Sequence, residues 1–229
     1  MTLNDFSSLA VSVARYGRGY YVAGKTTHQP EATLELYDME RCPYCRKVRE
    51  ALSELDLEYI ARTSTRGAAT RQQAVALGGK QMFPLLSDPN TGKLLYESED
   101  IIDYLWATYG GGRKRLGKLV APLNTASSML ASALRARGGK AETSTRVQPA
   151  ELLVLYSFEA SPYCRKVREV LGELDLHHHI ENVAKKSARR PELVALGGKM
   201  QVPYLVDPNT QTALYESEDI IAYLRKTYG

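Results

Sequence analysis

Two short stretches of the chain carry the residues that could do covalent chemistry. The first is Cys42-Pro43-Tyr44-Cys45, and the second is Ser161-Pro162-Tyr163-Cys164, in which serine replaces the leading cysteine. The chain has only three cysteines, and an odd, small number does not make a disulfide framework. In a reducing compartment, a Cys-x-x-Cys pair is typical of thiol–disulfide exchange or of metal binding. Zinc requires four ligands and the sequence has no second pair at ligand spacing, so exchange chemistry is favoured.

Both stretches belong to a long internal repeat. An offset of 119 residues (161 − 42) links Cys42 to Ser161, and the same offset links the LGGK, DPNT and YESEDII sequences of the first half to their copies in the second. More than half of the aligned positions from Leu34 to Gly110 are identical, so a whole folding unit is duplicated. We therefore divide the chain into an N-terminal helix and extension (1–32), a first domain (33–110), a linker with a helix (111–150) and a second domain (151–229).

Composition and charge narrow the class of protein. Of the 229 residues, 44% are hydrophobic and 24% are charged, which is ordinary for a globular chain. The net charge of +4 is dispersed among acidic residues and is too small to predict nucleic-acid binding. No apolar run approaches the roughly 20 residues that span a membrane, and no basic region precedes the first apolar stretch as it would in a secretory signal. We therefore predict a cytoplasmic protein that binds neither nucleic acid nor membrane.

Each unit is predicted to alternate strands and helices. In the first unit, the alternating run at 34–37 predicts a strand, and Pro43 suits the first position of the helix that follows, whose charged residues fall opposite its apolar ones. A strand near 58–61, a helix near 69–77, two strands around a DPNTG turn and a final helix opened by Ser98 complete the order βαβαββα. This α/β order, with strands of both directions, fits two tandem thioredoxin-like domains.

A short amphipathic helix is predicted before each domain. Residues 4–15 resemble residues 124–135, one residue off the main offset. Each stretch begins with Asn, carries small residues and apolar residues three or four apart, and ends with Arg. Because the pattern occurs twice, the first copy is interpreted as a structural helix rather than as a cleaved leader.

The site residues resemble those of the glutaredoxin and glutathione transferase N-terminal domain family. Cys42-Pro43-Tyr44-Cys45 is similar to the glutaredoxin active site, and Phe83-Pro84 and Val202-Pro203 stand where the family carries a cis-proline. Glu97-Ser98 and Glu216-Ser217 are similar to the Glu-Ser pair of the transferases. The resemblance covers both repeats, as a glutaredoxin-type tandem without the all-helical domain of full transferases.

The resemblance implies that Cys42 is the nucleophile of thiol–disulfide exchange and that Cys45 can resolve the mixed disulfide. At a helix start, with Arg41 and Arg46 nearby, the pKa of Cys42 should fall below its ordinary value. Glutathione is the implied co-substrate, disulfide or glutathionylated molecules are the implied partners, and no metal is implied. The implied glutathione-binding residues are Tyr44, Lys80, Phe83, Pro84, Glu97, Ser98, Tyr163, Gln201, Val202, Pro203, Glu216 and Ser217. Packing by Tyr44, a solvated Lys80 and helix capping by Ser98 stay open as other roles.

The second unit leaves three functions open. Ser161 cannot form a mixed disulfide, but its hydroxyl could stabilise a bound thiolate, as in serine-type glutathione transferases. The favoured hypothesis is a glutathione-dependent oxidoreductase that acts through Cys42, with the second domain a glutathione-binding or structural copy. The alternatives are a transferase activity that uses Ser161, and a non-catalytic glutathione-binding or redox-sensing module.

A run of three histidines, 177–179, lies where the second strand of the second domain is expected. Neighbouring side chains of a strand point to opposite faces, so three adjacent histidines do not readily converge on one metal ion. We expect a solvated or edge strand at this position instead.

Overall fold

The computed structural model describes residues 3–23, 28–113, 121–135, 137–142 and 147–229. Its helices and strands follow the chain in the predicted order, twice. The elements of the first half are α1 (Leu3–Ala14), β1 (Leu34–Asp38), α2 (Pro43–Glu54), β2 (Tyr59–Thr63), α3 (Thr70–Gly78), β3 (Leu85–Asp88), β4 (Lys93–Leu95) and α4 (Ser98–Tyr109). Those of the second half are α6 (Ala121–Leu134), β5 (Leu153–Ser157), α7 (Pro162–Glu173), β6 (His178–Asn182), α8 (Arg190–Gly197), β7 (Tyr204–Asp207), β8 (Thr212–Tyr215) and α9 (Ser217–Tyr228).

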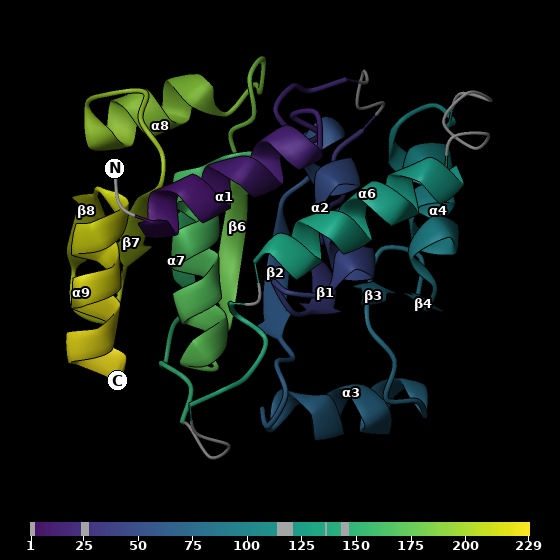
Figure 1. Cartoon of the computed structure of the whole chain (residues 1–229), viewed down its shortest axis with the longest axis horizontal. Coiled ribbons are helices and arrows are strands. Elements are labelled where there is room, and N and C mark those ends of the chain that lie inside the picture. Colours follow the sequence, from purple (N-terminus) through teal and green to yellow (C-terminus); the bar gives the residue numbers. More distant parts are fainter. Residues whose placement is uncertain (1–2, 24–27, 114–120, 136, 143–146) are drawn as a thin grey trace.

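All eight strands join one sheet in the order β4-β3-β1-β2-β6-β5-β7-β8 (Figure 1). Within each half the first two strands are parallel and the last two are antiparallel, which is the thioredoxin-like arrangement. We call residues 34–109 the first unit and residues 153–228 the second unit. The units meet where β2 and β6 pair antiparallel, with Ile60 opposite His179. The order of strands is therefore mirrored about this central pair.

The expectation of a solvated or edge strand at the histidine run is wrong. β6 lies at the centre of the sheet, and the side chains of His177 and His178 are buried. The sequence pattern of one unit does not say which of its strand edges will pair with the other unit. Edge pairing satisfies the free backbone groups of β2 and β6 and removes two exposed edges.

Each unit packs helices on both faces of its part of the sheet. Leu36 of β1 points into the main core with α2 and α4, whereas its neighbour Tyr37 packs on the other face with Ala74 of α3. Apolar residues of α2 such as Val48 and Leu52 are fully buried in that main core, which continues without interruption from the first unit into the second. The two units therefore share one core as well as one sheet.

The two leading helices are exchanged between the units. α1 precedes the first unit in the chain but packs on α7 of the second, while α6 precedes the second unit and packs on α2 of the first. The Ser8 hydroxyl donates to the carbonyl of Pro162 at 2.7 Å, and the Ser128 hydroxyl donates to the carbonyl of Pro43 at 2.8 Å. Figure 1 shows α1 and α6 side by side across α2 and α7. Each helix therefore contacts the first turn of a motif-bearing helix.

The charged side of α2 is buried, although its spacing resembles that of an ordinary solvated face. Arg46, Lys47, Arg49 and Glu50 each expose 2% of their surface or less, because α6 and the second unit cover them. Within the described part of the chain, no helix is long and apolar enough to cross a membrane.

Candidate functional site

Cys42 caps the N-terminus of α2. Its Sγ atom accepts a hydrogen bond from the backbone N–H of Cys45 at 3.4 Å, and Pro43 occupies the first helical turn. The hydrogen bond from the Cys45 thiol, helped by backbone N–H groups and the charge of Arg49, outweighs burial and lowers the pKa of Cys42 to about 7. The side chain is only partly buried. A substantial fraction of Cys42 is therefore thiolate near neutral pH and can be reached from solvent.

Cys45 has the opposite character. It is fully buried, and burial together with the neighbouring Cys42 raises the pKa of its thiol well above the ordinary value. It therefore stays protonated and donates its S–H to the Cys42 thiolate. This pairing of one reactive and one buried thiol is the arrangement that exchange followed by resolution requires.

A cavity of about 220 Å³ adjoins the first motif. It is lined by Tyr44, Met82, Phe83, Pro84, Glu97 and Ser98. Five of these were predicted from the sequence, and the Phe83–Pro84 peptide bond is cis, as the family resemblance implied. Met82 was missed, although it directly precedes Phe83. Lys80 is exposed and is not among the lining residues; its Nζ atom lies 5.8 Å from the ring centre of Tyr96.

The start of α4 forms one wall of this cavity. Glu97 has a φ of 61°, and its copy Glu216 has a φ of 65°, a conformation that is unfavourable for residues with a Cβ atom. Ser98, the first residue of α4, is buried and lines the cavity beside Glu97. The first N–H groups of a helix have no partner within the helix and favour an anion. The strained backbone of Glu97, which recurs at Glu216, therefore directs the chain into a helix N-terminus that can bind a carboxylate.

The second motif has the same backbone arrangement as the first, but its leading residue is buried. Ser161 caps α7 and its Oγ atom accepts from the N–H of Cys164 at 3.2 Å, yet only 4% of the serine is exposed. Of the remaining predicted residues, Pro203 and Ser217 are buried, Val202 is partly exposed, and Tyr163 is half-exposed. The Val202–Pro203 bond is also cis. Gln201 donates a hydrogen bond to the carboxylate of Glu216, so this carboxylate already has a partner within the chain.

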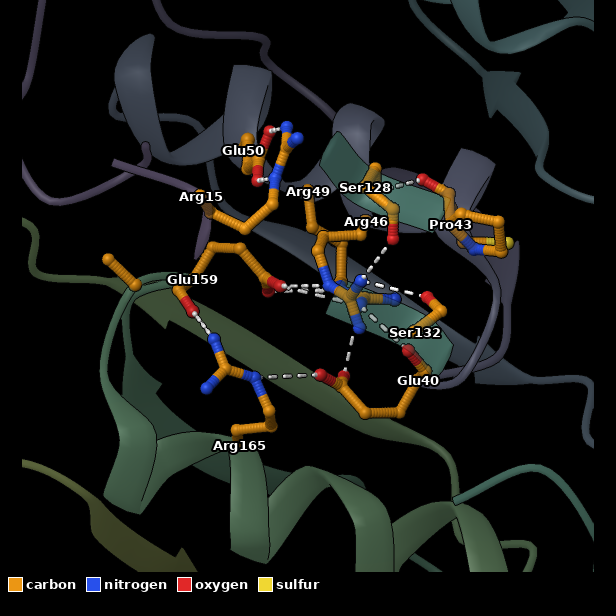
Figure 2. Close-up of polar contacts among 12 residues, drawn as sticks. Arg15, Glu40, Pro43, Arg46, Arg49, Glu50, Ser128, Ser132, Glu159 and Arg165 are labelled. Atoms are coloured by element: carbon orange, nitrogen blue, oxygen red, sulfur yellow. Dashed lines mark hydrogen bonds and ion pairs between the residues drawn. The ribbon is translucent and has the colours of Figure 1, made fainter. Parts of the chain in front are cut away.

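A buried network of charged residues joins the two motifs (Figure 2). The carboxylates of Glu40 and Glu159, each two residues before its motif, accept from both Arg49 and Arg168 over distances of 2.8 to 3.2 Å. Arg49 also pairs with Asp38 at 2.5 Å. In the second unit Ser157 takes the place of Asp38 and accepts from Arg168 at 3.1 Å. Each unit therefore completes the ion pairs of the other.

The charges in this network do not balance. Four guanidinium groups, those of Arg46, Arg49, Arg165 and Arg168, face three carboxyl groups. Burial alone would raise the pKa of Glu40, but Arg168 and Arg49 outweigh it and hold that pKa well below its usual range. Arg49, one of these four cations, also helps to lower the pKa of Cys42. Arg41 and Arg46 were the cations expected beside Cys42. Arg46 instead donates hydrogen bonds to the carbonyl of Ser128 and the hydroxyl of Ser132 on α6, and Arg41 is exposed.

Apart from Arg46, these network residues were not predicted as part of a site. The signal available in the sequence was that Glu40, Arg46 and Arg49 recur at the main offset as Glu159, Arg165 and Arg168. Repetition of charged residues on an amphipathic helix is not by itself distinguishable from a shared solvated face.

A second polar cluster lies where the units meet. Glu58, His179 and Glu181 place one ligand-type atom each within 4.8 Å of one another, and they are the group of described residues that could hold a metal ion. Arg189 already lies 3.2 Å from Glu181 and 3.8 Å from Glu58, so a cation of the chain itself already compensates part of the negative charge of this cluster. Only one histidine of the run reaches this cluster. His177 instead contacts Thr63 and Thr70, and His178 contacts the carbonyl of Leu176.

Comparison with known proteins points to one family. A profile described as "Glutathione S-transferase, N-terminal domain" matches residues 36–113 and again residues 155–229. The chain is 34% identical over 70 residues to a glutathione S-transferase-like protein, tpcF, of Aspergillus fumigatus, a match that covers 31% of each chain. It is 36% identical over 84 residues to protein URE2 of Candida maltosa, covering 35% of this chain and 26% of that one. The matches thus span about a third or less of these curated relatives.

Solved structures give a weaker likeness. A glutathione transferase of Bombyx mori aligns with a TM-score of 0.35 and 17% identity, covering 64% of this chain and 81% of that one. A trimeric glutathione transferase of Leishmania aligns with a TM-score of 0.31 and 16% identity, covering 86% of this chain and 67% of that one.

Proposed function

Because the chain belongs to the glutathione S-transferase N-terminal domain family, we propose that it is a glutathione-dependent thiol–disulfide oxidoreductase that acts through Cys42. The observation that carries the proposal is the difference between the two motifs. Cys42 is partly exposed, has a pKa lowered to about 7 and adjoins a cavity, whereas Ser161 is buried.

The proposed reaction begins with a glutathionylated substrate. The Cys42 thiolate attacks the glutathione sulfur, so a Cys42–glutathione disulfide forms and the substrate thiolate leaves and takes up a proton. A second glutathione, as thiolate, then attacks the glutathione sulfur of this mixed disulfide. Oxidised glutathione is released and the Cys42 thiolate is regenerated. Overall, the sulfur of one free glutathione is oxidised to the disulfide level, and the substrate sulfur is reduced to a thiol.

The cavity residues are assigned to binding glutathione. The backbone of Phe83, before the cis-proline, is suited to pair with the peptide backbone of glutathione, as the resemblance implies. Ser98 and the start of α4 are suited to bind a carboxylate. Cys45, a buried thiol one turn from Cys42, is assigned to resolution of mixed disulfides when glutathione is scarce. We assign the second unit a structural role, because its leading serine is closed to solvent and Gln201 already pairs with Glu216.

The test follows the release of glutathione from a glutathionylated peptide in the presence of excess glutathione. We expect Cys42→Ser to abolish turnover and Cys45→Ser to retain it, since the two-step reaction needs only one thiol. Ser161→Ala is the matched control at the equivalent position and should leave turnover unchanged. Turnover that survives Cys42→Ser would exclude the proposal. Conjugation of an electrophile that is lost on Ser161→Ala would support a transferase instead.

A further inference from the structure

A second cavity lies beside the one that adjoins Cys42. It has a volume of about 460 Å³ and is lined by Arg66, Gly67, Ala68, Arg71, Gln72 and Gln81. Two arginines and two glutamines thus line it, and no lining residue is acidic. Gln81 is followed directly by Met82 and Phe83, which line the cavity beside Cys42. A cavity with this lining favours an anionic ligand, because guanidinium groups bind carboxylates well.

Arg71 connects the two cavities. Its guanidinium carbon lies 4.7 Å from the centre of the Phe83 ring, and its Nη1 atom donates a hydrogen bond to the carbonyl of Ser64 at 2.9 Å. Burial, and then the positive charge of Arg66, lowers the pKa of Arg71 below its ordinary value. The two guanidinium groups therefore repel each other in a cavity whose lining supplies no carboxylate.

Two further basic residues lie beside Arg66. Lys140 of the linker pairs with Arg66 through the backbone, and both residues are exposed. The carbonyl of Gly139 accepts a hydrogen bond from the backbone N–H of Arg66 at 3.2 Å, and an added Cβ at Gly139 would lie 2.8 Å from the Cδ of Arg41, the residue before Cys42. Arg41, Arg66 and Lys140 form no ion pair with any residue that the structure describes. We define the basic patch as Arg41, Arg66, Arg71 and Lys140.

The second unit does not reproduce the basic patch. At the main offset, Arg41 corresponds to Ala160, Gln81 to Met200 and Lys140 to Tyr21. Lys185, which corresponds to Arg66, and its neighbour Lys186 lie over the ring of Tyr21, with their Nζ atoms 5.1 Å and 6.0 Å from its centre. The cations that lack a partner are therefore concentrated beside the reactive Cys42, not beside the buried Ser161.

We propose that the basic patch binds an acidic segment of the polypeptide whose glutathionylated cysteine Cys42 attacks. This inference rests on the proposed function and adds the class of substrate. A polypeptide segment fits better than a small anion because the basic residues come from separate parts of the chain, and because the cavity measures about 460 Å³, against about 220 Å³ beside Cys42. Opposite charges steer such a partner to the site and fix its orientation there.

The test compares two glutathionylated peptides of equal length, one with aspartates and one with lysines around the cysteine. We expect kcat/KM to be about tenfold higher for the acidic peptide at low salt, and the preference to shrink as added salt screens the charges. Arg66→Glu and Lys140→Glu should each reduce this preference at least about threefold. Both residues are exposed, so neither substitution should alter folding, which circular dichroism can check.

Lys226→Glu is the matched control, since Lys226 is exposed on α9 of the second unit and its replacement changes the net charge equally. It should leave the preference intact. Equal kcat/KM values for the two peptides, or a preference that survives both variants of the basic patch, would overturn the inference.

The mixed disulfide of glutathione and 2-mercaptoethanol separates this inference from the proposed function, because its leaving group carries no acidic segment. If the wild-type protein turns over this small disulfide but treats the two peptides alike, the inference fails alone. If it turns over none of the three substrates, the proposed function fails and the inference fails with it. A KM for glutathione that rises in Arg66→Glu, measured with the small disulfide, would instead assign the basic patch to glutathione itself.

Discussion

Arg49 and Glu159 belong to different units, and their side chains form a buried ion pair of 3.0 Å. The counterpart pair, Arg168 with Glu40, has the same length. Arg49 lies on the helix that Cys42 caps, and its charge helps to lower the pKa of that thiol. The second unit is therefore part of the electrostatic environment of the first motif, even though its own leading serine is closed to solvent.

Removal of one carboxylate from this network should destabilise the fold. In Glu159→Gln, Arg49 and Arg168 keep their buried charges but lose a shared partner, so we expect a loss of about 3 kcal/mol in the free energy of unfolding. Chemical denaturation measures this loss. Glu142→Gln is the control, because it removes an exposed pair with Arg225 and should change stability by no more than about 0.5 kcal/mol. Equal losses in the free energy of unfolding would show that the buried network stabilises the fold no more than an exposed ion pair does.

The reactivity of Cys42 should follow its lowered pKa. The rate of alkylation by iodoacetamide, followed by mass spectrometry, should rise with pH around a midpoint of about 7. Because the largest cause of the lowered pKa is the hydrogen bond from the Cys45 thiol, Cys45→Ala should move the midpoint upward, toward the ordinary thiol value. Cys164→Ala removes an equally buried thiol of the second unit and should leave the midpoint unchanged. An unshifted midpoint in Cys45→Ala would contradict this account.

Restoring the missing cysteine should not create a second reactive site. In the double variant Cys42→Ser with Ser161→Cys, the new thiol would occupy a position that is 4% exposed beneath α1. We expect its alkylation in the native protein to be at least about tenfold slower than that of Cys42, because reactivity requires access as well as thiolate character. Rapid alkylation, or restored turnover of the glutathionylated peptide, would mean that the serine alone inactivates the second motif.

The cluster between the units should make stability depend on pH. Burial, with repulsion from Glu58, raises the pKa of Glu181 to about 7. Its contribution is fully present below the unfolded value of 4.5 and is lost as the pH rises through about 7. Glu181→Gln should therefore leave stability unchanged near pH 4 and raise it near pH 8. The expected gain is on the order of 1 kcal/mol, because water still screens part of the carboxyl.

Glu58, the neighbouring carboxylate, provides a control because its pKa is shifted in the opposite direction. A hydrogen bond from His179 lowers the pKa of Glu58. Its contribution is present above the unfolded pKa and is lost as the pH falls. Glu58→Gln should thus reduce the free energy of unfolding most at neutral and higher pH. Thermal unfolding of Glu181→Gln and Glu58→Gln across the pH range tests both pKa shifts. If the stability of the two variants changed with pH in the same way, the assigned pKa shifts would be contradicted.

The amino-acid sequence by itself determined the contents of each unit. The order of strands and helices and the helix starts at Pro43 and Ser98 follow from residues close together in the chain, whereas the cis peptide before Pro84 was implied by the family resemblance. Local steric and hydrogen-bonding preferences decide such features. The repeat made these predictions firmer, because each pattern occurs twice. Five of the six residues that line the cavity were named from the family resemblance of these motifs.

Only the tertiary structure decided how the units meet. The pairing of β2 with β6, the exchange of α1 and α6 and the burial of the charged side of α2 all depend on contacts between residues more than 80 positions apart. Charged residues at helical spacing look alike in sequence whether they face water or an opposite charge from another unit. The partner that distinguishes the two cases, such as Glu159 for Arg49, is supplied by folding of the whole chain.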